Sequence, residues 1–452
     1  SLTFREGRVR LARYWDVPVE ASERDARPRD EMEESETFTQ QLLESVRLRL
    51  MGEVPVGVFL SGGIDSTAIA WAMKQADPSA LKSFSVGFDG DSEGELHYAR
   101  MAAQAIGTQH REVILRADEF RDSLEKLAWH LDEPNADGAC IPLMHLSRRA
   151  REEVVVVLSG EGADEILGGY QIYSKMLLME RARAVGGRVF EKALGLAQRG
   201  VRHQKVQKYL DLAQRPLEQR YFGVGRAFGD GLLREVFGES AQLRLAQHFA
   251  PYWERTRGKD PLHRLLYNDT KVWLPDDLLI KADKMTMAWA IELRVPFLDH
   301  ELLESAWALP PSLKRRGNLG KVLLRLSMAG KIPHDILHRP KKGFPLPLTR
   351  WLRTNLHAPC RERLLAQGSC VRGAVGARLL ERLLDAHRAG RADHTEELYA
   401  LWVLEEWHRA FLARSATETL RNRVRTDVIP RPSSLNEARL EPVTITGPQA
   451  QA

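Results

Sequence analysis

The segment Ser61-Gly62-Gly63-Ile64-Asp65-Ser66 combines glycines, hydroxyls and one carboxylate directly after the apolar run 56–60. If a buried strand ends here and a helix follows over 67–75, backbone N–H groups at the helix start would face one pocket, which suits a phosphate chain. The glycines let the backbone approach an anion closely, and the serines add hydroxyl donors. No Gly-Lys-Ser or Gly-Lys-Thr follows, so this is not a Walker loop. The pattern predicts a pyrophosphate-binding loop, with an ordinary capped strand-to-helix turn as the alternative.

Carboxylates gather at this turn and at a second one. Asp65 would repel a phosphate unless it holds a bound Mg²⁺ or caps the helix. The second turn, Ser159-Gly160-Glu161-Gly162-Ala163-Asp164-Glu165, also follows a buried run (154–158) and carries three acids. Three acids at one strand end repel each other unless a metal ion or a cationic substrate group neutralises them. An acidic helix start that complements the helix dipole explains one or two of them, but explains Glu161 between two glycines less well.

Two further segments carry charges that could meet a metal ion or an anion. One is Asp276-Asp277-Leu278-Leu279-Ile280-Lys281-Ala282-Asp283-Lys284-Met285, and the other is the basic loop Arg339-Pro340-Lys341-Lys342-Gly343-Phe344-Pro345. Each is a weak signal alone, because charged helices and basic loops are common on protein surfaces.

Strands that alternate with helices must position these turns. We expect strands at 56–60, 83–88, 111–115 and 154–158, and helices at 67–75, at 95–106 and in the stretch up to Trp129. This alternation predicts βαβ units and an α/β fold with a doubly wound, mostly parallel sheet. In such sheets ligands bind at the carboxyl ends of the strands, where Ser61 and Ser159 would lie.

The rest of the chain divides by composition. Residues 1–18 are typical of a short hairpin with Gly7 at its turn, residues 19–37 of a polar linker, and 36–50 of a helix. The main domain would span 38–415, and its second half is mostly helical from about 175 to 330. Beyond this domain the sequence has little periodicity, which predicts a disordered tail over 416–452.

Composition disfavours several classes of protein. The chain has 452 residues, is 43% hydrophobic and 28% charged, and contains no apolar run long enough to span a membrane. Its cysteines (Cys140, Cys360 and Cys370) are far apart, which disfavours a disulfide framework or a structural zinc site and favours a reducing, cytoplasmic setting. The net charge of +5 is spread over arginine-rich helices, which favours solvated surfaces over a nucleic-acid site. Because the chain starts at Ser1 without methionine, we expect a fragment or a processed product.

The four charged or glycine-rich segments, in this order, resemble the synthetase domain of glutamine-dependent asparagine synthetase and its amidotransferase relatives. The resemblance runs from about residue 38 to 355 and includes Ser83-Phe84-Ser85-Val86-Gly87-Phe88 and Asp132-Glu133-Pro134. It implies a sheet of the ATP-pyrophosphatase type, followed by a large helical second half.

The resemblance also implies ATP and Mg²⁺ as cofactors and assigns roles to residues of this sequence. The residues expected to bind the ATP pyrophosphate and its Mg²⁺ are Ser61, Gly62, Gly63, Asp65 and Ser66. Those expected to line the adenosine pocket are Leu60, Val86 and Gly160, with Ser159 beside them. Asp164 would be a second Mg²⁺ ligand, and Asp277 a further acid near the metals. Glu161 would take the proton of ammonia, and Lys341 would stabilise the leaving pyrophosphate.

The implied reaction is the ATP-dependent amidation of a carboxylate through an acyl-adenylate, in particular of aspartate to asparagine with release of AMP and pyrophosphate. A carboxylate oxygen is a poor leaving group until it is adenylated, and ammonia must then attack as the neutral species and lose a proton. The opening hairpin with Tyr14-Trp15 resembles the last strands of the glutaminase domain that supplies ammonia in complete family members. We therefore expect this chain alone to use free ammonia and not glutamine. The loop after Arg339 is the expected lid over the intermediate.

Other functions stay open at this point. Relatives of the same family act on other carboxylates in surface-polysaccharide or natural-product pathways, and some carry Tyr where this chain has Glu161. A tRNA-modifying ATP pyrophosphatase would share the first loop and the basic charge, but its paired catalytic cysteines are absent. A non-catalytic scaffold is disfavoured by the intact loops. The expected partners are small-molecule substrates and the glutaminase domain, with no membrane and with a homodimer as an open alternative.

Overall fold

The computed structural model describes residues 1–20, 30–79, 81–90, 95–200, 212–238, 240–340 and 346–413. Lys341 and the tail predicted over 416–452 lie outside these residues. No helix within the described parts of the chain has the length and apolarity needed to cross a bilayer.

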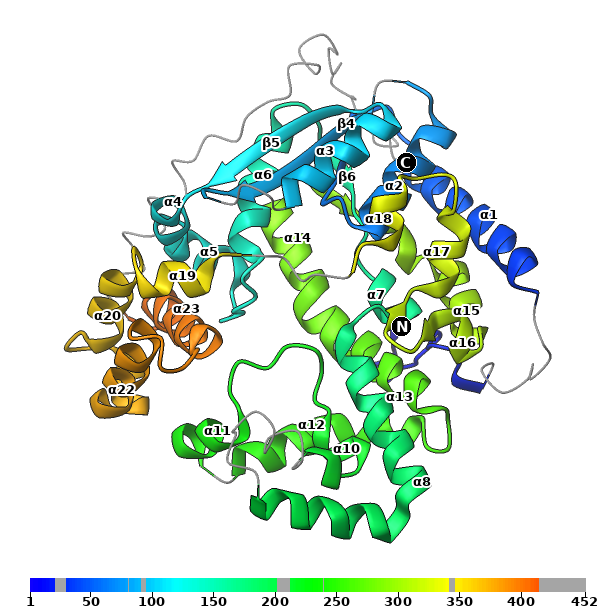
Figure 1. Ribbon diagram of the computed structural model, residues 1–452. Helices are drawn as coiled ribbons and strands as arrows, with labels where there is room; N and C mark the ends of the chain where they lie inside the picture. The colour runs from blue at the N-terminus through cyan, green and yellow to red at the C-terminus, as the bar shows by residue number, and fades with distance from the viewer. Residues whose placement is uncertain are drawn as a thin grey trace.

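Five strands form one sheet with the order β5-β4-β3-β6-β7, which lies in the upper part of the view in Figure 1. Its strands are β3 (Val56–Phe59), β4 (Lys82–Phe88), β5 (Gln109–Leu115), β6 (Val156–Leu158) and β7 (Glu292–Arg294). Every neighbouring pair is parallel, which confirms the predicted α/β fold. The sequence indicated the first four strands but not β7, because this short edge strand is mostly charged and has no apolar run to reveal it.

The order in which successive strands are added to the sheet changes sides at β3, the middle strand. From β3 it proceeds outward through β4 and β5, and it then returns to place β6 on the other side of β3. Val58 pairs with Leu158 in the register of these two strands. The turns that follow β3 and β6 therefore lie side by side at the carboxyl edge, at the switch point where α/β sheets bind ligands.

Both faces of the sheet are buried, and alternate residues of a strand enter different cores. Val58 and Leu158 belong to one hydrophobic cluster, and Phe59 and Val157 belong to another. The first cluster is built with α1 (Glu31–Arg49), α2 (Ile64–Ala76), α15 (His300–Ala308), α17 (Val322–Met328) and α18 (His334–His338). The second is built with α4 (Ala117–Asp122), α5 (Leu124–Leu131), α6 (Cys140–Arg151), α14 (Ile280–Met287) and the C-terminal helices.

Helix α1 begins at Glu31, earlier than the apolar spacing indicated. The Asp30 carboxylate caps it by accepting from the N–H groups of Met32 and Glu33. The first turn is acidic, which complements the helix dipole. Because its residues lack the apolar spacing of a helix, the sequence did not predict this turn. The polar residues 31–36, assigned to a linker from the sequence, thus form the start of the helix, whereas residues 21–29 of that predicted linker lie outside the described residues.

The second half of the chain is mostly helical, as predicted. Figure 1 shows α8 and α10–α12 in a lobe below the sheet, and the C-terminal helices to one side. The remaining elements are α3 (Glu95–Ile106), α7 (Ala163–Leu167), α8 (Gln171–Gly200), α10 (Leu217–Arg220), α11 (Asp230–Phe237), α12 (Ser240–Arg255), α13 (Pro261–Asn268), the π-helix η2 (Asp269–Leu279), the 3-10 turn η3 (Pro296–Leu298), α16 (Pro311–Lys314), β8 (Arg315–Arg316), β9 (Leu319–Gly320), α19 (Leu348–Arg353), α20 (His357–Leu365), α21 (Cys370–Val375), α22 (Ala377–Arg388) and α23 (Thr395–Phe411).

The predicted N-terminal hairpin is present as β1 (Leu2–Arg5) and β2 (Arg8–Leu11). Gly7 adopts a φ of +74° at the turn, as a tight hairpin requires. Leu2 pairs with Leu11 and Phe4 pairs with Val9, so four apolar side chains share one face. These side chains are 61–75% exposed, and this apolar face of the hairpin is uncovered in the described chain.

A buried carboxylate ties the helical lobe to the π-helix. The hydroxyls of Tyr173 on α8 and Tyr221 after α10 both donate to Asp269 Oδ2 at 2.5 Å. Asp269 is the first residue of η2, and burial raises its pKa to about 7. Two helical segments are thus joined at the base of the element that leads to Asp277.

Replacing this acid should change how stability depends on pH. The pKa of Asp269 is about 7 in the folded state and lies near its ordinary value of 3.8 in the unfolded state. The carboxyl is protonated in both states below pH ~3, so it lowers stability only as pH rises through the window between the two pKa values. The Asp269→Asn variant should remove a loss of up to about 1.4 kcal/mol per pH unit in that window.

Urea unfolding at several pH values between 4 and 8 checks this expectation. Asp118→Asn, at an exposed position on α4, is the matched control. Equal pH slopes for the wild type and Asp269→Asn would contradict the assignment.

Candidate active site

The turn after β3 is held in shape by its own hydroxyls. The Ser61 N–H donates to Ser66 Oγ at 3.2 Å, and the Thr67 hydroxyl donates to the Gly63 carbonyl at 2.7 Å. Gly63 precedes the first residue of α2, a helix of 13 residues, so the helix N-terminus opens at this turn. Gly62 has a φ of +70°, and a Cβ there would lie 2.3 Å from the Tyr98 backbone. The predicted turn between a strand and a helix N-terminus is therefore present, and its binding of an anion stays a prediction.

The turn after β6 approaches the first turn at van der Waals distance. The Ser159 N–H donates to the Arg294 carbonyl at 3.0 Å, which fixes the turn to β7. A Cβ on Gly160 would lie 2.8 Å from Asp65 Cβ and 2.9 Å from the Ser66 nitrogen. Only glycine allows this approach, and Asp164 follows in the first turn of α7.

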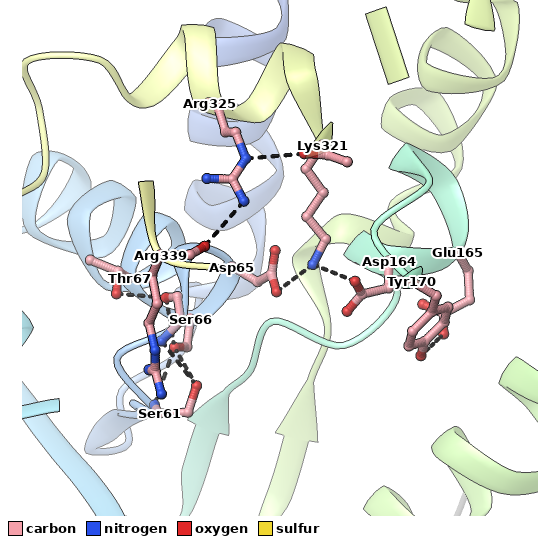
Figure 2. Close-up of polar contacts among 12 residues, drawn as sticks. Ser61, Asp65, Ser66, Thr67, Asp164, Glu165, Tyr170, Lys321, Arg325 and Arg339 are labelled. Carbon is pink, nitrogen blue, oxygen red and sulfur yellow. Dashed lines mark hydrogen bonds and ion pairs between the residues drawn. The ribbon is translucent and has the colours of Figure 1, made fainter. Parts of the chain in front are cut away.

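A buried ammonium group joins the two turns (Figure 2). Lys321 Nζ lies 2.6 Å from Asp65 Oδ2 and 2.7 Å from Asp164 Oδ1, and its side chain is 3% exposed. Lys321 has a φ of +56°, an uncommon conformation for a residue with a Cβ. A Cβ on Gly169 would lie 1.9 Å from Asp164 Oδ1 and 2.3 Å from Lys321 Cε, so this glycine leaves room for the contact.

The two carboxylates fit a divalent cation. Their oxygens already converge on one positive charge, and Asp65 Oδ1 is buried without a hydrogen-bond partner. Carboxylate oxygens are the ligands that Mg²⁺ prefers, usually together with water and substrate phosphates. In the described part of the chain, no group of three or more His, Cys, Asp or Glu side chains could hold a metal ion by itself. A Mg²⁺ ion bound here would therefore need phosphate and water to complete its coordination.

Two adjoining cavities open over these turns. The inner one has a volume of about 220 Å³ and a partly apolar wall that includes Phe59, Phe84 and Leu143. The predicted site residues that line it are Leu60, Ser61, Asp65, Ser66, Val86, Ser159, Gly160, Glu161 and Asp164. The outer one has a volume of about 680 Å³ and is lined by Gly63, Lys321, Arg325 and Arg339 among others. Six residues line both cavities and define their junction: Ser61, Asp65, Ala139, Glu161, Asp164 and Lys281.

Arginines hold the chain that leads to the basic loop against the first turn. Arg339 donates to the Gly62 carbonyl at 3.3 Å, and its guanidinium lies 4.0 Å from the centre of the Tyr98 ring. Arg325 donates to the carbonyls of Leu337 and Arg339. In Figure 2, Arg325 and Arg339 lie to the left of Lys321, as do Ser61 and Asp65. The predicted basic loop thus begins at the outer cavity, although Lys341 itself lies outside the described residues.

A second buried ion pair lies on another side of the junction. Lys281 Nζ donates to Asp137 Oδ2 at 2.7 Å, and the Lys281 side chain is 6% exposed. Burial disfavours charge on both groups, but their mutual attraction prevails, so the pKa of Asp137 is lowered and the pKa of Lys281 is raised. Glu161 also contributes to the raised pKa of Lys281, which places these two charges within electrostatic reach.

Asp277 lies within electrostatic reach of this pair and does not line either of the two cavities. Its Oδ1 accepts from Asn135 Nδ2 at 2.6 Å. Burial, followed by the charge of Asp137, raises the pKa of Asp277 to about 6. The role of Asp277 as an acid near the metals stays a prediction.

Sequence reasoning assigned no role to Lys321, Lys281 or Asp137. Lys321 follows a glycine in a segment without a motif, and only its contacts with distant acids reveal it. Lys281 belongs to a charged segment noted from the sequence, but its partner Asp137 is 144 positions away. No local pattern could have joined such pairs.

The close approach at Gly160 makes a testable prediction. Gly160→Ala should push the two turns apart and lower nucleotide affinity about tenfold or more, since overpacking costs about 1–3 kcal/mol. Titration with a fluorescent ATP analogue measures the affinity. Gly368→Ala is the matched control, since a Cβ there meets nothing within 4 Å. Unchanged affinity in Gly160→Ala would contradict the proposed packing.

Comparison with known proteins agrees with this geometry. The family model described as asparagine synthase matches residues 37–409. A putative glutamine-hydrolysing asparagine synthetase of Mycobacterium tuberculosis is 38% identical over 391 residues, which covers 84% of this chain and 58% of that protein. Asparagine synthetase [glutamine-hydrolyzing] 1 of Bacillus subtilis is 33% identical and covers 81% of this chain and 58% of its own length. Amidase chyE of Penicillium rubens is 29% identical, with coverages of 77% and 57%.

The chain therefore spans less than two thirds of the length of these relatives. The family match nevertheless includes both turns, the two cavities and the C-terminal helices up to α23. From this match and from the paired acids at the switch point of the sheet, we conclude that the chain belongs to the asparagine synthase family.

Proposed function

We propose that this chain catalyses the ATP-dependent amidation of a carboxylate through an acyl-adenylate. The observation that carries the proposal is the junction of the two cavities, where the anion-binding turn, two acids suited to Mg²⁺ and Glu161 meet. The adenosine would occupy the inner cavity against Leu60 and Val86, and the pyrophosphate would extend into the outer one. The α-phosphorus would then lie at the junction, within reach of an acceptor carboxylate.

In the first step, an oxygen of the acceptor carboxylate attacks the α-phosphorus and pyrophosphate leaves. The N–H groups at the start of α2 and the Ser61 and Ser66 hydroxyls would bind the phosphates. Asp65 and Asp164 would hold Mg²⁺, which supplies charge neutralisation for the departing pyrophosphate. Lys321, Arg325 and Arg339 line the outer cavity and would add positive charge there, together with Lys341.

In the second step, neutral ammonia attacks the acyl carbon and AMP leaves. The attacking nitrogen must lose a proton as the C–N bond forms, and Glu161 is the carboxylate at the junction that could accept it.

Aspartate is the acceptor that we propose, as in the asparagine synthetases to which the chain is similar. Another carboxylate is the second candidate, because amidases of fungi also match over most of the chain. The nitrogen donor would be ammonia released from glutamine by a further domain. The exposed apolar face of the β1–β2 hairpin is a suitable surface for such a domain to cover.

The decisive experiment follows pyrophosphate release with ATP, Mg²⁺ and ammonium, with and without L-aspartate, while mass spectrometry follows asparagine. Aspartate-dependent release with asparagine formed would support the full proposal. Release with another carboxylate would retain the mechanism and replace the acceptor. If no carboxylate supports release, the proposed function is wrong. Glutamine in place of ammonium tests whether this chain alone can obtain its nitrogen from glutamine.

The Asp65→Ala variant should lose pyrophosphate release about 100-fold or more, because both a phosphate-site ligand and a partner of Lys321 disappear. A coupled pyrophosphate assay measures the rate, and circular dichroism checks that the variant is folded. Asp118→Ala on α4 removes an exposed acid as the control. Wild-type rates in Asp65→Ala would rule out this site as the seat of adenylation.

The Glu161→Gln variant should separate the two steps. Exchange of labelled pyrophosphate into ATP should persist, because it needs only adenylation, whereas amide formation should fall about 10²- to 10⁴-fold. Glu152→Gln, at the exposed end of α6, is the control. Equal loss of exchange and amide formation would show that Glu161 acts before the ammonia step.

A further inference from the structure

A further cavity lies among the C-terminal helices, and the proposed mechanism does not use it. It has a volume of about 540 Å³ and is lined by residues of α4, α5, α20 and α23. None of its lining residues lines the inner or the outer cavity. This C-terminal cavity is therefore separate from the candidate active site, and its volume suits a small organic molecule.

A buried carboxylate forms part of the wall of the C-terminal cavity. Glu406 is 3% exposed, and its Oε1 accepts from Trp402 Nε1 at 3.0 Å and lies 3.0 Å from Arg363 Nε. In the part of the chain that the structure describes, Glu406 Oε2 has no hydrogen-bond partner. Burial raises the pKa of Glu406, because it disfavours the charged form. A ligand that donates N–H bonds to this carboxylate would stabilise its charge.

A guanidinium group lies one turn further along the same helix. Arg409 also lines the cavity, and it follows Glu406 by three positions on α23, so both side chains lie on one face of the helix. The guanidinium of Arg409 makes no hydrogen bond or ion pair with another described side chain. The wall of the cavity thus presents a buried acceptor and a cationic donor side by side.

These two groups match the two charges of a free amino acid. A single carbon atom joins the ammonium and the carboxylate of an α-amino acid, so the two charges can meet neighbouring side chains of one helix face. A ligand with only negative charge would be repelled by Glu406. A ligand with only positive charge would be repelled by Arg363 and Arg409. A zwitterion avoids both penalties.

We propose that the C-terminal cavity binds a free α-amino acid, with its ammonium group on Glu406 and its carboxylate on Arg409. The side chain of the amino acid would lie against the apolar part of the wall, which contains Leu124, Pro359 and Trp402. This inference goes beyond the proposed function, which assigns no ligand to the C-terminal helices.

A thermal-shift screen of the standard L-amino acids tests the proposal, because a ligand that binds only the folded state raises the unfolding temperature. At least one amino acid should stabilise the wild type but not the Glu406→Gln/Arg409→Met variant. An amino acid that binds in the active site should stabilise both proteins equally. Arg378→Met/Glu381→Gln is the matched control, since these residues have the same spacing on α22 and do not line the cavity.

Isothermal titration calorimetry then separates the two charges of the amino acid that the screen identifies. Its affinity should fall about tenfold or more in Glu406→Gln and in Arg409→Met alike. The wild type should bind its N-acetyl derivative and the amine without the carboxylate about tenfold or more weakly. Glu406→Gln removes the partner charge of Arg363 and could lower stability, whereas Arg409→Met breaks no ion pair of the described chain and keeps the test valid.

Two results would overturn the proposal. One is a screen in which every amino acid affects the wild type and the Glu406→Gln/Arg409→Met variant equally. The other is an amino acid that binds Arg409→Met as tightly as the wild type. Neither measurement uses ATP or follows pyrophosphate release, so failure here is distinct from failure of the proposed function.

Discussion

The site depends on one electrostatic constraint: two carboxylates lie close together at the carboxyl edge of the sheet. Asp65 and Asp164 come from turns that pack at van der Waals distance, and Lys321 lies between them. Two negative charges that contact the same ammonium group repel each other and would destabilise the folded chain without a cation between them. Lys321 meets that need within the protein itself, and a substrate-bound metal would meet it during the reaction.

The packing around this point follows from the same constraint. Glycines stand where a side chain would separate the acids or exclude the lysine, as at Gly160 and Gly169. The adoption of a positive φ by Lys321 costs free energy, and its two ion pairs compensate for this cost. On another side of the junction, the buried Lys281 likewise neutralises a carboxylate, that of Asp137. The cavity wall thus contains two buried cations that belong to separate elements.

Much of the fold could be predicted from the sequence, because it is encoded in local patterns. A local pattern of a few residues predicts each of the four apolar strands, the two glycine-rich turns and the N-terminal hairpin. Strand β7 and the first turn of α1 were missed because charged residues form them, and capping or pairing with distant elements stabilises them. The roles of Lys321 and Lys281 depend on partners far away in sequence, which no period or motif reveals. Lys341, the lysine that the sequence did single out, lies outside the described residues.

The separation of Lys321 from Asp65 also has a consequence for synthesis of the chain. These residues are 256 positions apart, and β7, which fixes the turn after β6, also lies far downstream of β3. A ribosome therefore releases both acids long before the lysine that neutralises them. The nascent sheet must carry uncompensated charge at its carboxyl edge, and its central strand pair gains full stability only when the second half has emerged. Contacts of such long sequence separation form late and slow the folding of a domain. We therefore expect this site to be among the last parts of the molecule to assemble.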